Sequence, residues 1–288
     1  MDTREPTELA PASLSELRSA RRLQRRKERR RLGLFLAEGP QAAREALATR
    51  GCAQKLFVTA PAAARHAGLV SAADALNIPI RLVSEEDLAS LTDTVTPQGL
   101  VAVCHLVDRG LDEVFDASTR LAVCCVQVRD PGNAGTVIRC ADVFGADAVL
   151  LTEGSVDAYN PKTVRASAGS IFHLRLAAEV GLSEVVRAAR ANGIQVLAAD
   201  GAGEVELPAL AASHELNVPT LWLFGNEAWG FPPEQARLAD HRVRVPIYGG
   251  AESLNLATAA AVCLYASATA QRLPSGSQTR SRLEGGAS

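Results

Sequence analysis

Three short stretches of the sequence place amide, carboxylate, hydroxyl and guanidinium side chains shortly after apolar runs. They read NAGTVIR, GNEAWG and GGAESLN, and each contains glycine. Such groups can bind and orient a polar ligand, and a glycine lets the backbone approach that ligand closely. The side chains that carry this chemistry are Asn133, Arg139, Glu227, Ser253 and Asn255.

Each stretch, taken alone, also fits a purely structural role. Asn133 is a good N-cap for a helix, with Arg139 on its surface, and Glu227 can be a solvated or paired residue of a turn. Glu252 and Ser253 can cap the helix that follows them, which leaves Asn255 unexplained by helix entry.

The elements around these stretches alternate between apolar runs and amphipathic segments. Nearly continuous apolar strands between helices predict a parallel sheet covered on both faces, whose ligands bind at the carboxyl ends of the strands. In the second half we expect strands at 120–128, 146–152, 172–177, 193–200, 220–225 and 241–247, and helices at 133–145, 160–170, 182–193, 232–240 and 253–270.

The first half predicts a smaller α/β domain, with strands at 34–40, 55–60, 78–84 and 99–107 and helices at 41–48, 61–77 and 85–94. The chain of 288 residues is long enough for two domains. We expect a disordered arm at 1–20, the small domain at 21–107, a linker at 108–118, the larger domain at 119–272 and a disordered tail at 273–288.

The positive charge lies at the front of a chain whose formal net charge is −2. Nine of the fourteen residues from Arg18 to Arg31 are basic. This segment is either a phosphate-contacting patch or a solvated face of a helix or arm. Candidate RNA contacts within it are Arg21, Arg22, Arg25, Arg26, Arg29 and Arg30.

Composition narrows the class of protein further. The six cysteines form no CxxC pair and mostly lie in apolar runs, and the five histidines are scattered, so we expect reduced thiols and no metal site. No signal peptide or membrane-length apolar run is recognisable, which predicts a cytoplasmic protein without a membrane partner. Neither domain has a GxGxxG after its first strand, which disfavours a nucleotide-binding oxidoreductase.

Together, the three stretches resemble the SpoU (TrmH) branch of the SPOUT RNA methyltransferases over about residues 119–270. The matches are Asn133, Gly135 and Arg139 in the first stretch, Gly225, Asn226 and Glu227 in the second, and Gly249, Ser253, Leu254 and Asn255 in the third, with Pro246 at the end of the strand before it. Ala228, Ile247 and Ala266 depart from the family pattern without removing a residue assigned to chemistry. The front domain, marked by FLAEGPQAAREAL, is more weakly similar to the ribosomal-protein-like substrate-binding domain of that family.

The resemblance implies a parallel-sheet SPOUT domain with a deep trefoil knot, preceded by a small α/β RNA-binding domain. It implies a homodimer that transfers a methyl group from S-adenosylmethionine to a ribose 2'-hydroxyl of structured RNA, with no metal. Catalytic roles would fall to Asn133, Arg139, Glu227, Ser253 and Asn255, and cofactor binding to Gly225, Val245, Ile247 and Leu254. Lys162 and Arg165 would line the RNA path, although the same segment also fits a helix capped by Asn160.

Several alternatives stay open at this point. Ribosomal RNA is the favoured substrate because a front domain is present; the alternatives are transfer RNA, or a catalytically silent RNA-binding or ribosome-assembly protein on the same fold. Arg139 is a poor general base at its ordinary pKa. It would act through a shifted pKa, through a bound phosphate, or by orienting the alkoxide electrostatically.

Overall fold

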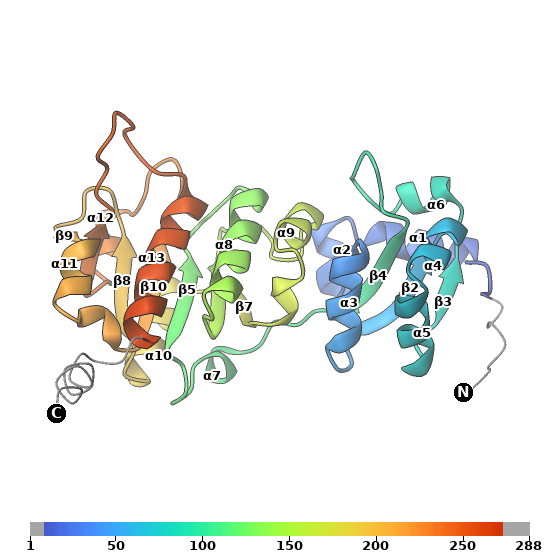
Figure 1. Ribbon diagram of the computed structural model, residues 1–288, viewed down its shortest axis with the longest axis horizontal. Coiled ribbons are helices and arrows are strands. Elements are labelled where there is room, and N and C mark those ends of the chain that lie inside the picture. Colours follow the sequence, from blue (N-terminus) through green and yellow to red (C-terminus); the bar gives the residue numbers. More distant parts are fainter. Residues whose placement is uncertain (1–8, 273–288) are drawn as a thin grey trace, which may run out of the picture.

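The computed structural model describes residues 9–272 of the chain, as two α/β units side by side (Figure 1). The front unit is a four-stranded sheet with the order β1-β4-β2-β3, in which β4 is antiparallel to both of its neighbours. Its strands are β1 Leu34–Glu38, β2 Ala53–Val58, β3 Ile80–Leu82 and β4 Leu100–His105, and its helices are α1 Leu14–Arg22, α2 Arg26–Leu32, α3 Pro40–Ala48, α4 Ala60–Arg65, α5 Ala67–Ala75 and α6 Glu85–Ala89.

Helix α1 corrects the expectation that residues 1–20 form a disordered arm. Ser13 and Glu16 form a capping box at its start, in which Ser13 Oγ accepts from the Glu16 N–H and Glu16 accepts from the Ser13 N–H. Leu17 and Ala20 are buried against the front sheet. Burial of this apolar face stabilises the helix, and the polar composition of the segment concealed it. The rest of the expected disorder, at 1–8 and 273–288, lies outside the described residues.

The second unit confirms the predicted parallel sheet. Its seven strands have the order β7-β6-β5-β10-β8-β11-β9, and every neighbouring pair in this sheet is parallel. The strands are β5 Leu121–Cys125, β6 Ala148–Thr152, β7 Arg175–Val180, β8 Gln195–Ala199, β9 Val205–Glu206, β10 Thr220–Phe224 and β11 His241–Arg244. All residues of β5, β6 and β10 are buried, as expected for strands covered on both faces.

Helices cover both faces of this sheet (Figure 1). One face carries α8 Pro131–Val143, α11 Leu207–Ala212 and α13 Leu256–Arg272, and the other carries α7 Leu111–Val114, α10 Leu182–Ala191 and α12 Pro233–Ala236. Helix α9 Pro161–Ala166 packs against both α8 and β1, with the short 3-10 turns Ser170–Phe172 and Glu215–Asn217 elsewhere in the unit. Trp222, in the central strand β10, is fully buried, and its Nε1–H donates to Ser267 Oγ on α13 at 2.9 Å.

Several predicted elements in this unit differ from the structure in their bounds or were missed. Strand β7 begins at Arg175 because the preceding residues form a 3-10 turn, and β9 and α11 occupy residues to which we assigned no element. Helix α13 begins at Leu256 and not at Ser253. Gly135 lies where two helices approach each other closely: a Cβ there would lie 2.5 Å from Ala166 Cβ, so α8 and α9 pack through this glycine.

The two units meet through a polar and aromatic junction. Phe35 of β1 packs against the rings of Tyr159 and Phe172, at centroid distances of 4.7 and 5.9 Å. His173 bridges the units, because its ring nitrogens lie 2.9 Å from Asp142 and 3.1 Å from Glu45. The pKa of His173 is raised, chiefly by its hydrogen bond with Asp142.

Candidate active site at the carboxyl edge of the parallel sheet

The start of helix α8 places Asn133 differently from the prediction. Asp130 is the N-cap, because its Oδ1 accepts from the Asn133 N–H at 2.7 Å, and Pro131 is the first helical residue. The pKa of Asp130 is lowered, chiefly by this hydrogen bond. Asn133 is therefore not the cap, and its side-chain amide is available for other contacts.

Glu227 is held at the start of α8. Its carboxylate accepts from Asn133 Nδ2 at 3.1 Å and from the backbone N–H groups of Arg129 and Asp130, each at 3.4 Å. The N-terminus of a helix favours a negative charge, so this position offsets the cost of a carboxylate beside a buried strand. The structure thus pairs Glu227 with a second functional candidate.

Asn255 joins the same group of residues from the third stretch. Its Oδ1 accepts from the backbone N–H groups of Ala257 and Thr258, at 2.9 and 3.3 Å, and so caps α13. Its Nδ2 donates to Asn133 Oδ1 at 3.0 Å. The prediction that Glu252 or Ser253 caps this helix is wrong. The cap is Asn255, for which the sequence alone gave no structural role. We call the Glu227–Asn133–Asn255 series the three-loop network.

The loop after β10 is closed tightly on itself. Asn226 and Gly230 exchange backbone hydrogen bonds at 3.1 and 2.9 Å. A Cβ on Gly225 would lie 2.7 Å from the Gly230 carbonyl oxygen, so glycine is required here for loop closure. Asn226, to which sequence reasoning gave no role, is 6% exposed and donates from Nδ2 to the Gln127 carbonyl at 2.7 Å. An amide directly after a core strand was the signal for it.

Two of the five catalytic candidates lie outside the three-loop network. Arg139 is exposed on α8, six residues after Asn133, which places the two side chains about 120° apart around the helix. Ser253 is exposed in the connection between β11 and α13. Neither side chain makes a hydrogen bond within residues 9–272. Hydrogen bonds within the chain therefore join Asn133, Glu227 and Asn255, but not Arg139 or Ser253.

The candidate cofactor residues follow two strands on the same edge of the sheet. Gly225 follows β10 directly and Val245 follows β11, with β8 between these strands. Ile247 and Leu254 lie in the connection to α13 and are 38% and 37% exposed. Half-exposed apolar side chains at the carboxyl edge of a parallel sheet suit the adenosine part of S-adenosylmethionine.

The basic residues of the front unit are extensively paired. Arg29 is only 3% exposed; its guanidinium donates to Asp157 and to the carbonyl oxygens of Leu23 and Gln24, at 2.8 and 2.9 Å for the carbonyls. Arg29 is therefore a structural residue of the junction, and the prediction of an RNA contact fails for it because its donors are occupied. The other paired candidates are Arg21 with Asp87, Arg22 with Glu28, Arg26 and Arg30 with Glu179, Lys162 with Asp130, and Arg165 with Glu38 and Asp93.

The segment around α9 serves mainly as a capped helix start, which was the alternative to a role in lining the RNA path. Asn160 caps α9 by accepting from the Lys162 N–H at 2.9 Å. Tyr159 is buried, and its hydroxyl donates to Asp108 Oδ1 at 2.6 Å while accepting from two backbone N–H groups. Burial, and then the Asp108 carboxylate, raises the pKa of Tyr159.

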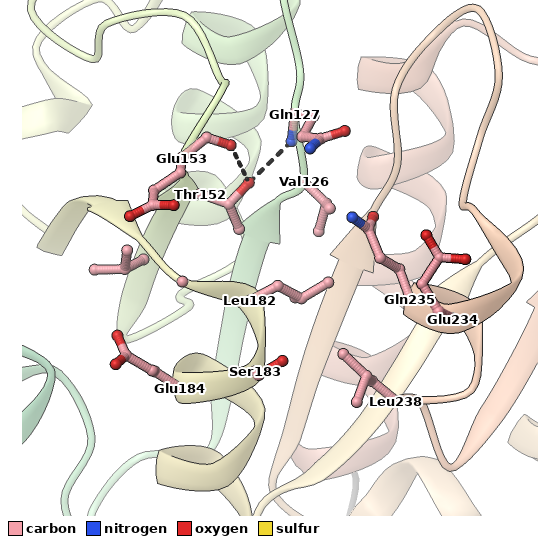
Figure 2. Close-up of a pocket in the computed structure, with 12 residues that line it drawn as sticks. Val126, Gln127, Thr152, Glu153, Leu182, Ser183, Glu184, Glu234, Gln235 and Leu238 are labelled. Atoms are coloured by element: carbon pink, nitrogen blue, oxygen red, sulfur yellow. Dashed lines mark hydrogen bonds between the residues drawn. The ribbon is translucent and has the colours of Figure 1, made fainter.

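A pocket of about 630 Å³ that sequence reasoning missed lies at the carboxyl ends of β5, β6 and β7. Figure 2 shows Thr152 among the residues that line it, and its Oγ1 accepts from the Gln127 N–H at 3.0 Å. Glu153, Glu184 and Glu234 line it together with apolar side chains. This acidic lining disfavours a phosphate ligand there.

Two other kinds of site, a reactive thiol and a metal centre, find little support in the described part of the chain. Burial, with a smaller contribution from the Glu227 carboxylate, raises the pKa of Cys125 to about 12, so this thiol stays protonated. Within residues 9–272, no three or more His, Cys, Asp or Glu side chains are grouped to hold a metal ion. The helices of this range include none that is long and apolar enough to cross a membrane.

Comparisons with known proteins identify families for both units of the chain. The profile of the SpoU rRNA Methylase family matches residues 120–265, and that of the MRM3-like substrate binding domain matches residues 15–102. The 23S rRNA (guanosine(2553)-2'-O)-methyltransferase RlmP of Bacillus subtilis is 33% identical over 261 residues, which cover 90% of this chain and 98% of that protein.

Solved structures give the same result over nearly the whole chain. The AdoMet-bound rRNA methyltransferase of Sinorhizobium meliloti superposes with a TM-score of 0.79 and 30% identity, covering 91% of this chain and 98% of that one. The SpoU methyltransferase AviRb of Streptomyces viridochromogenes, in complex with AdoMet, gives a TM-score of 0.77 and 27% identity, with 94% and 100% covered.

Proposed function

The chain belongs to the SpoU rRNA methylase family, and from this membership we propose that it transfers the methyl group of S-adenosylmethionine to a ribose 2'-hydroxyl of ribosomal RNA. The observation that carries the proposal is the three-loop network, which joins the three family stretches at one edge of the sheet. A front unit that matches a substrate-binding domain, and relatives named as rRNA 2'-O-methyltransferases, favour ribosomal over transfer RNA.

We assign the cofactor to the loops that follow β10 and β11, with Gly225, Val245, Ile247 and Leu254 as its contacts. Bound S-adenosylmethionine supplies the methyl group. The protein must align the ribose hydroxyl with that group, because in-line placement contributes much of the rate. Glu227, Asn133 and Asn255 fix the loops around the reaction, and Ser253 lies exposed beside them.

We further propose that Arg139 acts in the site of a second copy of the chain. Val143 lies one helical turn after Arg139 on α8 and is 67% exposed. Tyr265 and Val262, on the neighbouring helix α13, are 61% and 38% exposed. Exposed apolar side chains on adjacent helices are typical of an isologous dimer interface. A dimer formed through these side chains would bring Arg139 to the interface, and this supports a role for it there.

The same membership leads us to propose a trefoil knot between β11 and α13. Support comes from the packing of α13 on β5, β8 and β10, which requires the chain to return across the sheet after β11. The cytoplasmic location predicted from the sequence stays a prediction.

We propose that the exposed basic residues of the front unit bind RNA phosphates. Arg25 is exposed and has no ion pair among residues 9–272, and the side chains of the paired residues Arg21, Arg22, Arg26 and Arg30 are 43–55% exposed. Exposed pairs contribute only ~0–1 kcal/mol, so an RNA phosphate can replace the carboxylate partner. Lys162 and Arg165 extend this surface on the second unit.

The first experiment is a methyl-transfer assay with labelled S-adenosylmethionine, total ribosomal RNA and, separately, total transfer RNA. We expect label at a 2'-hydroxyl of ribosomal RNA, mapped by ribose-methylation sequencing. Label only in transfer RNA would refute the substrate. No label in either RNA, with cofactor and RNA binding intact, would favour the silent RNA-binding alternative.

Mixing two inactive variants tests the role of Arg139. If Arg139 serves the site of the second subunit, a heterodimer of Arg139→Ala and Asn133→Ala chains has one site with both residues intact. Co-refolding then restores about a quarter of wild-type activity, since half of the dimers are mixed and each has one active site of two. No restoration would place Arg139 in the site of its own subunit.

A further inference from the structure

The two tryptophans of the chain have opposite environments. Trp222 is fully buried in the central strand, whereas Trp229 is 48% exposed in the loop that follows that strand. Trp229 belongs to no core cluster of the described residues. Large exposed aromatic side chains at a site edge are more often used for binding than for stability.

The loop holds Trp229 in a defined place. Asn226 and Gly230 close the loop by mutual backbone hydrogen bonds, and the Asn226 side chain ties it to the end of β5 through Gln127. Asn226 Oδ1 also accepts from the Ala228 N–H at 2.9 Å. Because the loop is already fixed, little conformational entropy is lost when Trp229 binds a ligand.

Arg129 lies against the exposed ring. Its guanidinium carbon is 5.0 Å from the ring centroid of Trp229, which is a cation–π distance. Arg129 is itself exposed, and no carboxylate within residues 9–272 forms an ion pair with it. Its backbone N–H donates to Glu227, so the pair lies directly beside the three-loop network.

We propose that Trp229 and Arg129 form a stacking platform for an unstacked base of the RNA substrate, next to the target ribose. Aromatic rings and guanidinium planes both stack on bases, and an unpaired guanidinium also attracts the adjoining phosphate. The inference rests on the proposed function and adds two substrate-positioning residues to it. Stacking one base would hold the neighbouring ribose against the network and leave cofactor binding to other residues.

Tryptophan fluorescence tests the contact without requiring catalysis. Only Trp229 is accessible to iodide in the free protein, because Trp222 is buried. A fragment of ribosomal RNA that the wild-type protein binds should quench part of the emission and protect the remaining Trp229 emission from iodide. The variant Trp229→Phe should lose this RNA-dependent change. Emission from Trp229 that is shielded from iodide before RNA is added would overturn the proposal, because the platform would then be covered in the dimer.

Steady-state kinetics with matched variants test the role. Trp229→Leu keeps an apolar side chain but no ring, and should raise the KM for RNA on the order of ten- to hundred-fold with a small effect on kcat. The KM of Trp229→Phe for RNA should stay close to the wild-type value. Equal KM values for the two variants would refute stacking, because packing alone would then account for the effect.

Arg129→Gln should lower RNA affinity and reduce the slope of log affinity against log salt by about one unit. Arg187→Gln, on the exposed face of α10, is the control and should leave both unchanged. S-adenosylmethionine affinity should stay within about two-fold in all variants. A large loss of cofactor affinity in Trp229→Leu would overturn the proposal, whereas absence of methyl transfer by the wild type would instead refute the proposed function.

Discussion

The buried ion pair between Arg29 and Asp157 offers a sharp test of how the two units are joined. Substituting Asp157→Asn keeps the shape of the side chain and removes the charge that balances Arg29. The Arg29 side chain is 3% exposed and that of Asp157 is 13% exposed, so water can replace little of the lost interaction. Breaking a buried pair typically costs ~3–5 kcal/mol. Because asparagine still accepts a hydrogen bond, we expect a loss near the lower end, about 3 kcal/mol.

Urea unfolding at neutral pH, followed by circular dichroism, measures this loss. The matched control is Asp87→Asn, which removes the same charge from the exposed pair with Arg21. That pair is 3.1 Å long with side chains 43% and 38% exposed, so its loss should cost about 0.2–1 kcal/mol. Equal effects of the two substitutions would refute the reasoning, since burial would then not decide the strength of the pair.

Two further substitutions separate structural from RNA-binding arginines. Arg29→Met should lower stability by about 3 kcal/mol or more, because it leaves a buried carboxylate unpaired. Arg25→Ala should change stability by less than ~0.5 kcal/mol and instead reduce the salt dependence of RNA binding by about one unit. The reverse pattern would restore Arg29 as an RNA contact.

Three further outcomes follow from the junction and the core. The pKa of His173 is raised in the folded protein, so its ion pairs stabilise the fold fully below the ordinary histidine pKa and lose this effect as pH rises through the raised value. His173→Gln should therefore be most destabilising at about pH 5.5. The difference in urea midpoint from the wild type should shrink towards about pH 8.5. Ser267→Ala should cost about 1–3 kcal/mol in urea unfolding by leaving the Trp222 indole N–H buried without an acceptor. Gly135→Ala should cost ~1–3 kcal/mol in the same assay, because the added methyl would collide with α9; wild-type stability would show that the two helices can separate.

The parallel sheet was predictable because strands near its centre are apolar along nearly their whole length. The run at Leu121–Cys125 has no polar residue, and neither has the run at Ala148–Leu151, so only burial on both faces accounts for them. Helix α1 was not predictable in the same way. Its apolar face consists of a few residues whose partners, such as Phe57 and Leu88, lie far along the chain.

The role of the basic segment depended on contacts that local sequence does not reveal. Asp157 lies 128 residues after Arg29, and Glu179 lies 153 residues after Arg26. A run of arginines gives the same pattern whether its partners are phosphates or distant carboxylates. The fold decides between the two, and it divides the segment: Arg29 faces inward, while Arg25 stays exposed.

The start of α8 was locally encoded but ambiguous. Both Asp130 and Asn133 are good N-cap residues. Proline at position 131 favours the earlier start, since its fixed backbone angle suits the first helical position and its missing N–H costs nothing there. That start leaves the Asn133 side chain unused by the helix, and this is the condition for its contact with Glu227.

The three-loop network explains why the sequence needs two asparagines and a glutamate rather than other polar residues. Glu227 can only accept hydrogen bonds, so it fixes the Asn133 amide with Nδ2 towards it and Oδ1 away. That oxygen then requires a donor, which Asn255 supplies while its own oxygen caps α13. Serine lacks the reach to do both, and aspartate lacks the donor. Every donor in the series points towards Glu227, so the N-terminus of α8 stabilises this carboxylate directly and that of α13 does so through two amides.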